Sequence, residues 1–139
     1  MAIPVNDNQC VVCGQLNPIG LHVSWEVEGT GSVRGVVTVP ESFMGFHGVV
    51  HGGMVTALMD DAMWHAVHQA TGWSSYTVDI ATRFRSPVPT GSPVLVRARF
   101  LEAAHRLARA EASVLHAQGG AVLASASARF MPPRDSSVR

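Results

Sequence analysis

One stretch of helical periodicity constrains the fold of this chain more than any other feature. Between Gly53 and about Thr71, apolar residues recur at spacings of three and four, with no Gly or Pro from Met54 onward. Gly72 follows as a stop signal. No second stretch of this kind exists in the chain, so the apolar face of this helix must pack on a sheet. We therefore expect an α+β fold with one long helix.

Six further stretches have the alternation or β-branched content of strands, two before the helix and four after it. They are residues 21–28, 33–39, 75–85, 93–103, 106–116 and 121–131. We expect an antiparallel sheet of about six strands wrapped around the helix, in one domain of residues 1–139. Residues 1–20 are expected to be irregular, and residues 132–139 to form a frayed tail. Alternating alanines in the last two strands leave room for the sheet to approach the helix.

The charge balance narrows the classes of function. Ten basic and ten acidic residues cancel, and charged residues make up only 14% of the chain, which argues against an electrostatic nucleic-acid binder. No apolar run approaches about 18 residues, so we expect no transmembrane helix. The N-terminus also lacks the pattern of a signal peptide. We expect a cytoplasmic protein with no nucleic-acid or membrane partner, and its low charge density favours an oligomer.

The segment His51-Gly52-Gly53, placed where the helix begins, carries the first chemical signal. Glycines at a helix start let a ligand approach bare backbone N–H groups, which together with the helix dipole can hold an oxyanion. Asp60 follows nine residues after His51 in an otherwise apolar stretch, where a carboxylate is unusual without a task. The alternatives are a tight turn for the glycines and a solvated helix face for Asp60.

Helical geometry limits how these residues can cooperate. Nine residues turn a helix by roughly 180° net and advance it by about 13 Å. His51 and Asp60 of one chain therefore point to opposite sides and cannot meet over one small substrate. If both take part in catalysis, a two-fold dimer with two shared sites is required.

The stretch Val50-His51-Gly52-Gly53, with Asp60 at this spacing and this order of elements, resembles the hotdog-fold acyl-CoA thioesterases of the PaaI-like branch. The resemblance covers roughly residues 10–131, including the opening Cys10-x-x-Cys13-Gly14. It implies that the helix is the "sausage" wrapped by the sheet, and that homodimers pair into homotetramers. It implies an acyl-CoA or acyl-carrier-protein substrate and no cofactor.

The resemblance also implies roles for single residues. Asp60 would be the general base or, less often, the nucleophile. The N–H of Gly52 or Gly53 would polarise the thioester carbonyl, and His51 would shape that pocket. Thr77 falls where relatives carry a Ser or Thr near the attacking water.

This chain departs from the family pattern just before the histidine. Many relatives carry an Asn or Gln six or seven positions before it, where this chain has Gly45 and Met44. His47 is a candidate replacement for that amide.

Other residues give weaker signals. Arg83 and Arg85 alternate along a strand and share a face, so they could meet coenzyme A phosphates or form a solvated sheet face. Trp64, four residues after Asp60, could line an acyl pocket, and Asp61 could contact substrate at the pocket mouth.

Two patterns could in principle hold a metal. Asp61, His65 and His68 share a helical face, and Cys10 and Cys13 have half of a zinc-ribbon spacing. We interpret the first as a polar stripe and the second as a thiol-containing turn, and assign no metal. A site that the two cysteines share with His22 or with another chain stays open as an alternative.

The expected function is hydrolysis of an acyl thioester to a carboxylic acid and a free thiol. One alternative is a non-catalytic acyl-thioester-binding protein, which the missing Asn or Gln favours and the presence of Asp60 opposes. A second is a hotdog dehydratase acting on 3-hydroxyacyl thioesters. That chemistry needs a His and a carboxylate poised over the same substrate carbons, and the spacing of His51 and Asp60 fits it poorly.

Overall fold

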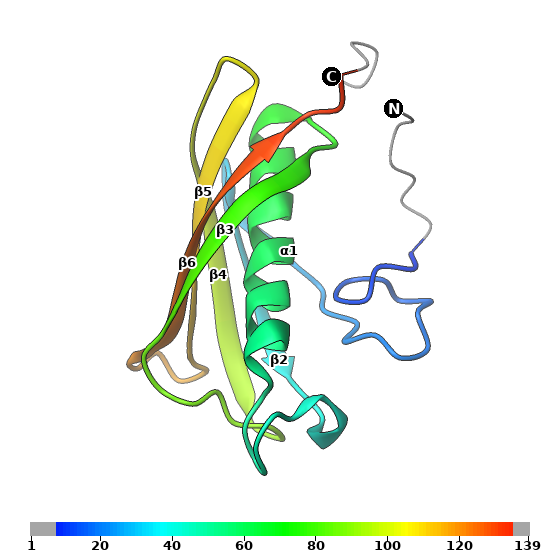
Figure 1. The fold of residues 1–139 in the computed structure, drawn as a ribbon, viewed down its shortest axis with the longest axis vertical. Helices are drawn as coiled ribbons and strands as arrows, with labels where there is room; N and C mark the ends of the chain where they lie inside the picture. Colours follow the sequence, from blue (N-terminus) through cyan, green and yellow to red (C-terminus); the bar gives the residue numbers. More distant parts are fainter. Residues whose placement is uncertain (1–7, 135–139) are drawn as a thin grey trace.

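The computed structural model describes residues 8–134 and shows one helix lying across one face of an antiparallel sheet (Figure 1). A short 3-10 helix, η1, precedes the main helix. The elements, in chain order, are β1 (Glu26–Gly29), β2 (Ser32–Thr38), η1 (Glu41–Phe43), α1 (Gly52–Thr71), β3 (Tyr76–Phe84), β4 (Pro93–Ala104), β5 (Leu107–His116) and β6 (Val122–Met131).

The six strands form a single sheet in the order β1-β2-β4-β5-β6-β3, and every neighbouring pair is antiparallel. This confirms the predicted layout of one long helix on about six antiparallel strands. β1 and β3 are the two edges of the sheet. On the edge strand β3, Val78 and Phe84 are 48% and 53% exposed. No other strand within residues 8–134 pairs with this apolar edge, and an edge of this kind can pair with another chain.

The core lies between α1 and the inner face of the sheet. The largest fully buried side chain is Phe130 of β6, and Leu58, Met59 and Met63 of α1 are buried with it. The six alternating alanines of β5 and β6 are all buried, and Ala110 and Ala112 pair with their counterparts across the two strands. Their small side chains let the sheet approach the helix, as the sequence predicts.

Both ends of α1 are specified locally. At the start, His51 is the N-cap, and its Nδ1 accepts a hydrogen bond from the Gly53 N–H at 2.9 Å. At the end, Gly72 has φ 75° and donates its N–H to the His68 carbonyl at 2.8 Å. A left-handed residue in this position is the usual helix stop and favours glycine.

The first predicted strand, 21–28, is wrong in its extent, because β1 covers only Glu26–Gly29. The preceding residues instead bond to the N-terminal segment: the Leu21 N–H donates to Val11 O and the Val23 N–H to Val12 O, each at 2.9 Å. That segment is irregular and turn-rich over residues 8–20, as predicted, and it lies along α1 on the side away from the sheet (Figure 1).

The other predicted strands agree with β2 to β6 within two residues at each end. The parts of the predicted N-terminal segment and tail at 1–7 and 135–139 lie outside the described residues. Over residues 8–134, no helix has the length and hydropathy that crossing a membrane requires.

Candidate active site

A line of polar and small residues runs along the contact between α1 and β3. Thr56 Oγ1 donates a hydrogen bond to Thr82 Oγ1 at 3.2 Å, and one turn later Asp60 meets β3. At the start of the helix, a Cβ built on Gly52 would lie 3.3 Å from Phe84 Cζ. We call this contact the α1–β3 seam, and its residues are Gly52, Thr56, Asp60 and Trp64 of α1 with Thr77, Thr82 and Phe84 of β3 and the adjacent Ser75.

Asp60 is the ionisable residue of the seam. Its side chain is half-buried, and its Oδ1 accepts a 2.7 Å hydrogen bond from Thr77 Oγ1. Burial raises the pKa of the Asp60 carboxyl above its usual range, the neighbouring Asp61 charge raises it further, and the Thr77 hydroxyl opposes both. A carboxylate with a raised pKa is a better proton acceptor near neutral pH.

The amides at the start of α1 are not equivalent. The Gly53 N–H is bonded to the His51 side chain, and the Met54 and Val55 N–H groups both donate to His51 O, at 2.9 and 3.1 Å. Among residues 8–134, the Gly52 N–H has no hydrogen-bond partner in the protein. Of the two amides that the sequence offers, Gly52 is therefore the one that can bind a ligand oxygen, because the His51 cap occupies the Gly53 amide.

A cavity of about 490 Å³ opens beside this amide. Its walls are mostly apolar, with His51 and Arg85 as the groups that can carry charge. The lining residues are Gly45, Phe46, Val49, Val50, His51, Gly52, Val55, Phe84, Arg85, Ser86, Pro87 and Val88.

The structure separates Arg83 from Arg85, which corrects the prediction that they share a face. Arg85 follows the end of β3 and lines the cavity next to Gly52. Arg83 lies within β3 and lines a different hollow of about 600 Å³ on the sheet, together with Arg97 and Glu111. His47 lies in an exposed turn and is not among the residues that line either hollow.

Trp64 lies on the seam one turn after Asp60. Its Nε1 donates to Ser75 O at 2.7 Å, and its ring stacks on His68 at a centroid distance of 4.9 Å. This hydrogen bond anchors the indole at Ser75, two residues before Thr77, which bonds to Asp60.

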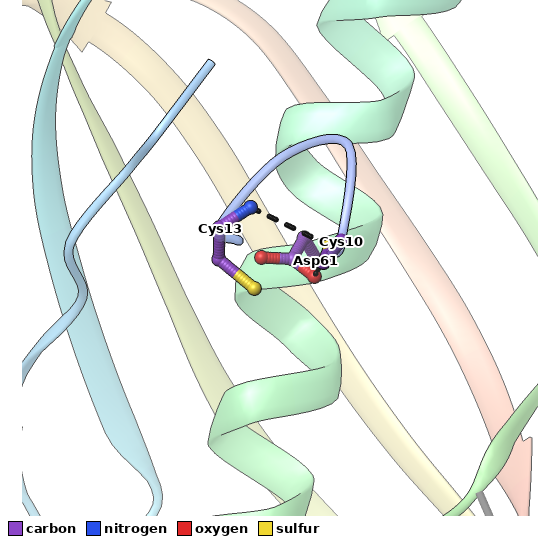
Figure 2. Close-up of side chains that lie close together, drawn as sticks. All are labelled: Cys10, Cys13 and Asp61. Atoms are coloured by element: carbon purple, nitrogen blue, oxygen red, sulfur yellow. Dashed lines mark hydrogen bonds between the residues drawn. The ribbon is translucent and has the colours of Figure 1, made fainter. Parts of the chain in front are cut away.

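Asp61 lies against the turn of the N-terminal segment that contains Cys10 and Cys13 (Figure 2). Its Oδ2 accepts a 2.7 Å hydrogen bond from Trp25 Nε1, and its Oδ1 lies 3.5 Å from Cys10 Sγ. Asp61 lines neither hollow, so its predicted place at the mouth of a substrate pocket is not what the structure shows.

Cys13 and His65 surround the same carboxylate. Burial, followed by the nearby charge of Asp61, raises the pKa of the Cys13 thiol strongly. Burial also lowers the pKa of His65 below its usual value, against the attraction of Asp61. The contact of the cysteines with Asp61 and the Trp25 bond were not anticipated from sequence, where the thiols and the helix appear as unrelated patterns.

One chain holds the two halves of the predicted site at separate places. His51 is the N-cap of α1, Gly52 is its first residue, and Asp60 lies within the same continuous helix. About 13 Å of helix axis therefore separates His51 from Asp60. A single protomer therefore does not unite the Gly52 amide and the Asp60 carboxylate over one small group.

Comparison with known proteins shows the family. Residues 47–126, more than half of the chain, match the sequence model of the thioesterase superfamily. A search of curated proteins gives no match.

Solved structures agree with this match. A crystal structure of a thioesterase superfamily protein superposes with a TM-score of 0.81 at 27% identity over 89% of this chain, which spans 60% of that protein's length. A phenylacetic acid degradation-related protein from Ralstonia eutropha superposes at 0.68 with 25% identity, covering 80% of this chain and 85% of the other.

The Escherichia coli PaaI protein of the phenylacetic acid degradation operon, at 17% identity, shares the fold with a TM-score of 0.72 over 81% of this chain and 80% of its own. The six-stranded sheet around one helix is thus the hotdog fold. The chain belongs to the thioesterase superfamily, and its structural neighbours are hotdog proteins of the PaaI-like kind.

Proposed function

We propose that this protein hydrolyses an acyl thioester, carried by coenzyme A or an acyl carrier protein, to a carboxylic acid and a free thiol. The observation that carries the proposal is the half-buried Asp60 carboxylate, held by the Thr77 hydroxyl at 2.7 Å, in a member of the thioesterase superfamily. Aryl-acyl thioesters are the first substrates to test, because two of its relatives are proteins of phenylacetic acid degradation.

The proposed reaction needs a base, a positioned water and a site for oxyanion charge. Asp60 takes a proton from water, and the resulting hydroxide adds to the thioester carbonyl carbon. The carbonyl oxygen gains negative charge and accepts a hydrogen bond from the Gly52 N–H, at the positive end of the α1 dipole. When the C–S bond breaks, its electrons leave with the sulfur, and the proton held by Asp60 returns to the thiolate.

Thr77 positions the base. Its hydroxyl donates to one carboxylate oxygen of Asp60 and leaves the other oxygen to accept a proton from water. Trp64, one turn further along α1 and anchored by its bond to Ser75 O, would provide an apolar wall for the acyl group.

Two protomers complete the proposed site. Asp60 is level with Thr77 near one end of β3, and Gly52 is level with Phe84 at the other end. If two β3 edges pair antiparallel about a two-fold axis at Ala81, Asp79 lies opposite the partner's Arg83, and the register shift between Thr77 and Asp79 places Thr77 opposite the partner's Phe84. That pairing brings Asp60 of one protomer to the partner's Gly52 and covers the exposed apolar edge.

The second candidate is a binding protein without turnover. It is favoured by Gly45 and Met44, because neither supplies the amide side chain that many relatives carry before the histidine. His47 lies in an exposed turn and does not line the cavity beside Gly52.

Thiol release from a panel of acyl-CoAs, followed with a chromogenic thiol reagent, tests the two candidates. We expect wild-type turnover and a loss of roughly 10²–10⁴-fold in kcat for Asp60→Asn, the range for removal of a general base. The amide can still accept the Thr77 hydroxyl and is cheaper to bury than a carboxylate, so Tm should be unchanged or higher.

Glu102→Gln is the matched control, since Glu102 is exposed and bonds to Arg109 away from the seam. Binding of acyl-CoA by the wild type without thiol release would favour the second candidate. Equal turnover by Asp60→Asn and Glu102→Gln would remove Asp60 from the reaction.

A further inference from the structure

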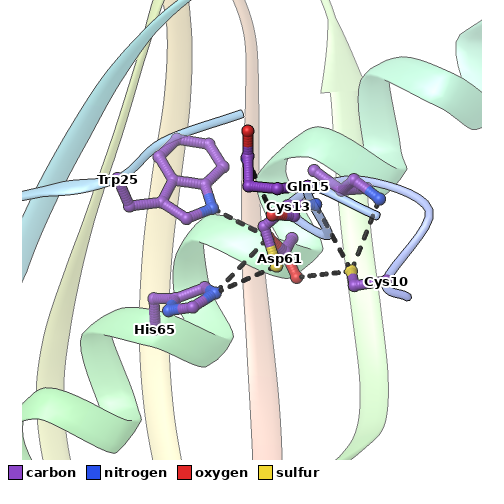
Figure 3. Close-up of polar contacts among 7 residues, drawn as sticks. Cys10, Cys13, Gln15, Trp25, Asp61 and His65 are labelled. Carbon is purple, nitrogen blue, oxygen red and sulfur yellow. Dashed lines mark hydrogen bonds and ion pairs between the residues drawn. The ribbon is translucent and has the colours of Figure 1, made fainter. Parts of the chain in front are cut away.

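The turn that contains both cysteines packs on the side of α1 that carries Asp61 and His65 (Figures 2 and 3). One sulfur from each cysteine and one carboxylate oxygen of Asp61 all lie within 4.8 Å of one another. His65 Nε2 adjoins this group, 3.4 Å from Cys13 Sγ and 3.6 Å from Asp61 Oδ2. We propose that Cys10, Cys13, Asp61 and His65 bind a structural zinc ion, a site for which the sequence alone gave no assignment.

The spacing of these atoms suits a tetrahedral zinc site. With Zn–S near 2.3 Å and Zn–N or Zn–O near 2.0–2.1 Å, neighbouring ligand atoms of different kinds lie about 3.3–3.6 Å apart. Two contacts lie in this range: Cys10 Sγ to Asp61 Oδ1 at 3.5 Å and His65 Nε2 to Cys13 Sγ at 3.4 Å. Because the mutually close group consists of the cysteines and Asp61, His65 is the ligand that shifts inward to close the site.

The cysteine turn is built to carry negative charge on sulfur. The N–H groups of Val12 and Cys13 both point at Cys10 Sγ, each at 3.4 Å. A neutral thiol is a weak acceptor, whereas a metal-bound thiolate is stabilised by such donors. The turn closes with the Gly14 N–H on Cys10 O at 2.9 Å, and a Cβ at Gly14 would lie 2.3 Å from Cys10 N, so this backbone requires glycine.

The surroundings of Asp61 match the second shell of a metal site. Its Oδ2 accepts the Trp25 Nε1 proton at 2.7 Å, which leaves Oδ1 on the side of Cys10. Outer hydrogen bonds of this kind fix the orientation of a ligating carboxylate. Trp25 is itself held in place by β2, because a Cβ on Gly35 would lie 2.8 Å from its ring.

The chemistry of the ligands selects the ion and its role. Two thiolates with an imidazole favour zinc over magnesium or calcium, which prefer oxygen ligands only. Four protein ligands fill the tetrahedron and leave no open position for substrate, which marks a structural site. The ion would fasten the N-terminal segment to α1, on a different face from Asp60 and through none of the atoms that bond Asp60 to Thr77, so the proposal does not depend on thioester hydrolysis.

The test is metal analysis of the tag-free protein, purified with its thiols reduced after growth in zinc-supplemented medium. We expect about one zinc per chain, released by a strong chelator with a fall in Tm. Adding Co²⁺ to the metal-free protein should produce the visible bands of tetrahedral cobalt and a near-ultraviolet thiolate-to-metal band. This measurement needs no variant, so it stands even where a substitution prevents folding.

Variants then assign the ligands. The double variant Cys10→Ser/Cys13→Ser should abolish the thiolate band, and each single variant should weaken it. Asp61→Asn and His65→Ala should weaken zinc binding, and Trp25→Phe should weaken it roughly 10–100-fold. His22→Ala and His68→Ala are the matched controls and should keep the metal.

The proposal is overturned if the folded, reduced wild type takes up neither zinc nor cobalt. It is also overturned if Cys10→Ser/Cys13→Ser retains the metal, or if the cysteines reoxidise to a disulfide in the presence of excess zinc.

Discussion

Gly52 offers a way to remove one proposed oxyanion donor without disturbing the helix. Gly52→Pro deletes the N–H, which has no protein partner within residues 8–134, so no internal hydrogen bond is lost. Proline is well tolerated at the first residue of a helix, because its φ suits the helix and the N–H there is unsatisfied anyway. The preceding residue, His51, has φ −55° and ψ 135°, an extended conformation that is compatible with a following proline.

The size of the effect follows from the role of the amide. Loss of a single oxyanion-hole donor costs about 10²–10³ in kcat, or about 2.7–4 kcal/mol of transition-state stabilisation. Gly52→Ala is the control, since it adds a Cβ at the same 3.3 Å from Phe84 Cζ and keeps the N–H. Because Phe84 is 53% exposed, its ring can move, and we expect Gly52→Ala to stay within about tenfold of the wild type.

The assay is steady-state thiol release from the best acyl-CoA of the panel, with kcat and KM measured separately and Tm recorded for each variant. We expect the loss in Gly52→Pro to fall mainly on kcat, because the charge on the oxygen develops in the transition state. Equal kcat values for Gly52→Pro and Gly52→Ala, at equal Tm, would refute the assignment of the amide.

Two further substitutions probe the seam and the core. Thr77→Val keeps the shape of the side chain but removes the donor to Asp60. A hydrogen bond to a charged group contributes about 1.5–3 kcal/mol, so kcat should fall at least roughly tenfold. An unchanged kcat would show that the bond plays no part in catalysis. Phe130→Ala, at a fully buried position, should lower the free energy of unfolding in urea by about 3–5 kcal/mol. Val36→Ala, at a residue that is 58% exposed, should change it by less than about 0.5 kcal/mol, and similar values for the two would contradict the assigned core.

The fold was predictable because its signals are local. A single helical stretch ending at Gly72 and a set of alternating strands leave few arrangements, and the alanines of β5 and β6 show which faces meet the helix. The extent of β1 was not predictable. The strand-like residues before Glu26 hydrogen-bond to the irregular N-terminal segment and not to another strand.

The candidate site was predictable as residue types at a spacing, but not as contacts. The sequence offers two glycine amides, and only the geometry of the His51 cap shows that Gly53 is occupied. Arg83 and Arg85 share a face by strand alternation, but β3 ends at Phe84, so the alternation stops between them.

The prediction and the structure differ most at two sequence patterns that are weak when taken separately. A Cys-x-x-Cys turn and a polar stripe on a helix each have an ordinary explanation, and periodicity within a segment does not say which segment packs on which. Cys10 and Asp61 are 51 positions apart in the sequence, yet Cys10 Sγ lies 3.5 Å from Asp61 Oδ1 in the structure. A contact of this range depends on the path of the N-terminal segment over α1.

In the proposed mechanism, Asp60 of one protomer works with the Gly52 amide of its partner. Mixing Asp60→Asn and Gly52→Pro chains, by unfolding and refolding them together in equal amounts, tests it directly. Each variant alone should be nearly inactive, whereas half of the mixed population should be dimers in which one of the two sites is intact. A site shared between protomers predicts recovery of about a quarter of the wild-type rate. No recovery from a refolded, demonstrably mixed population would contradict the shared site.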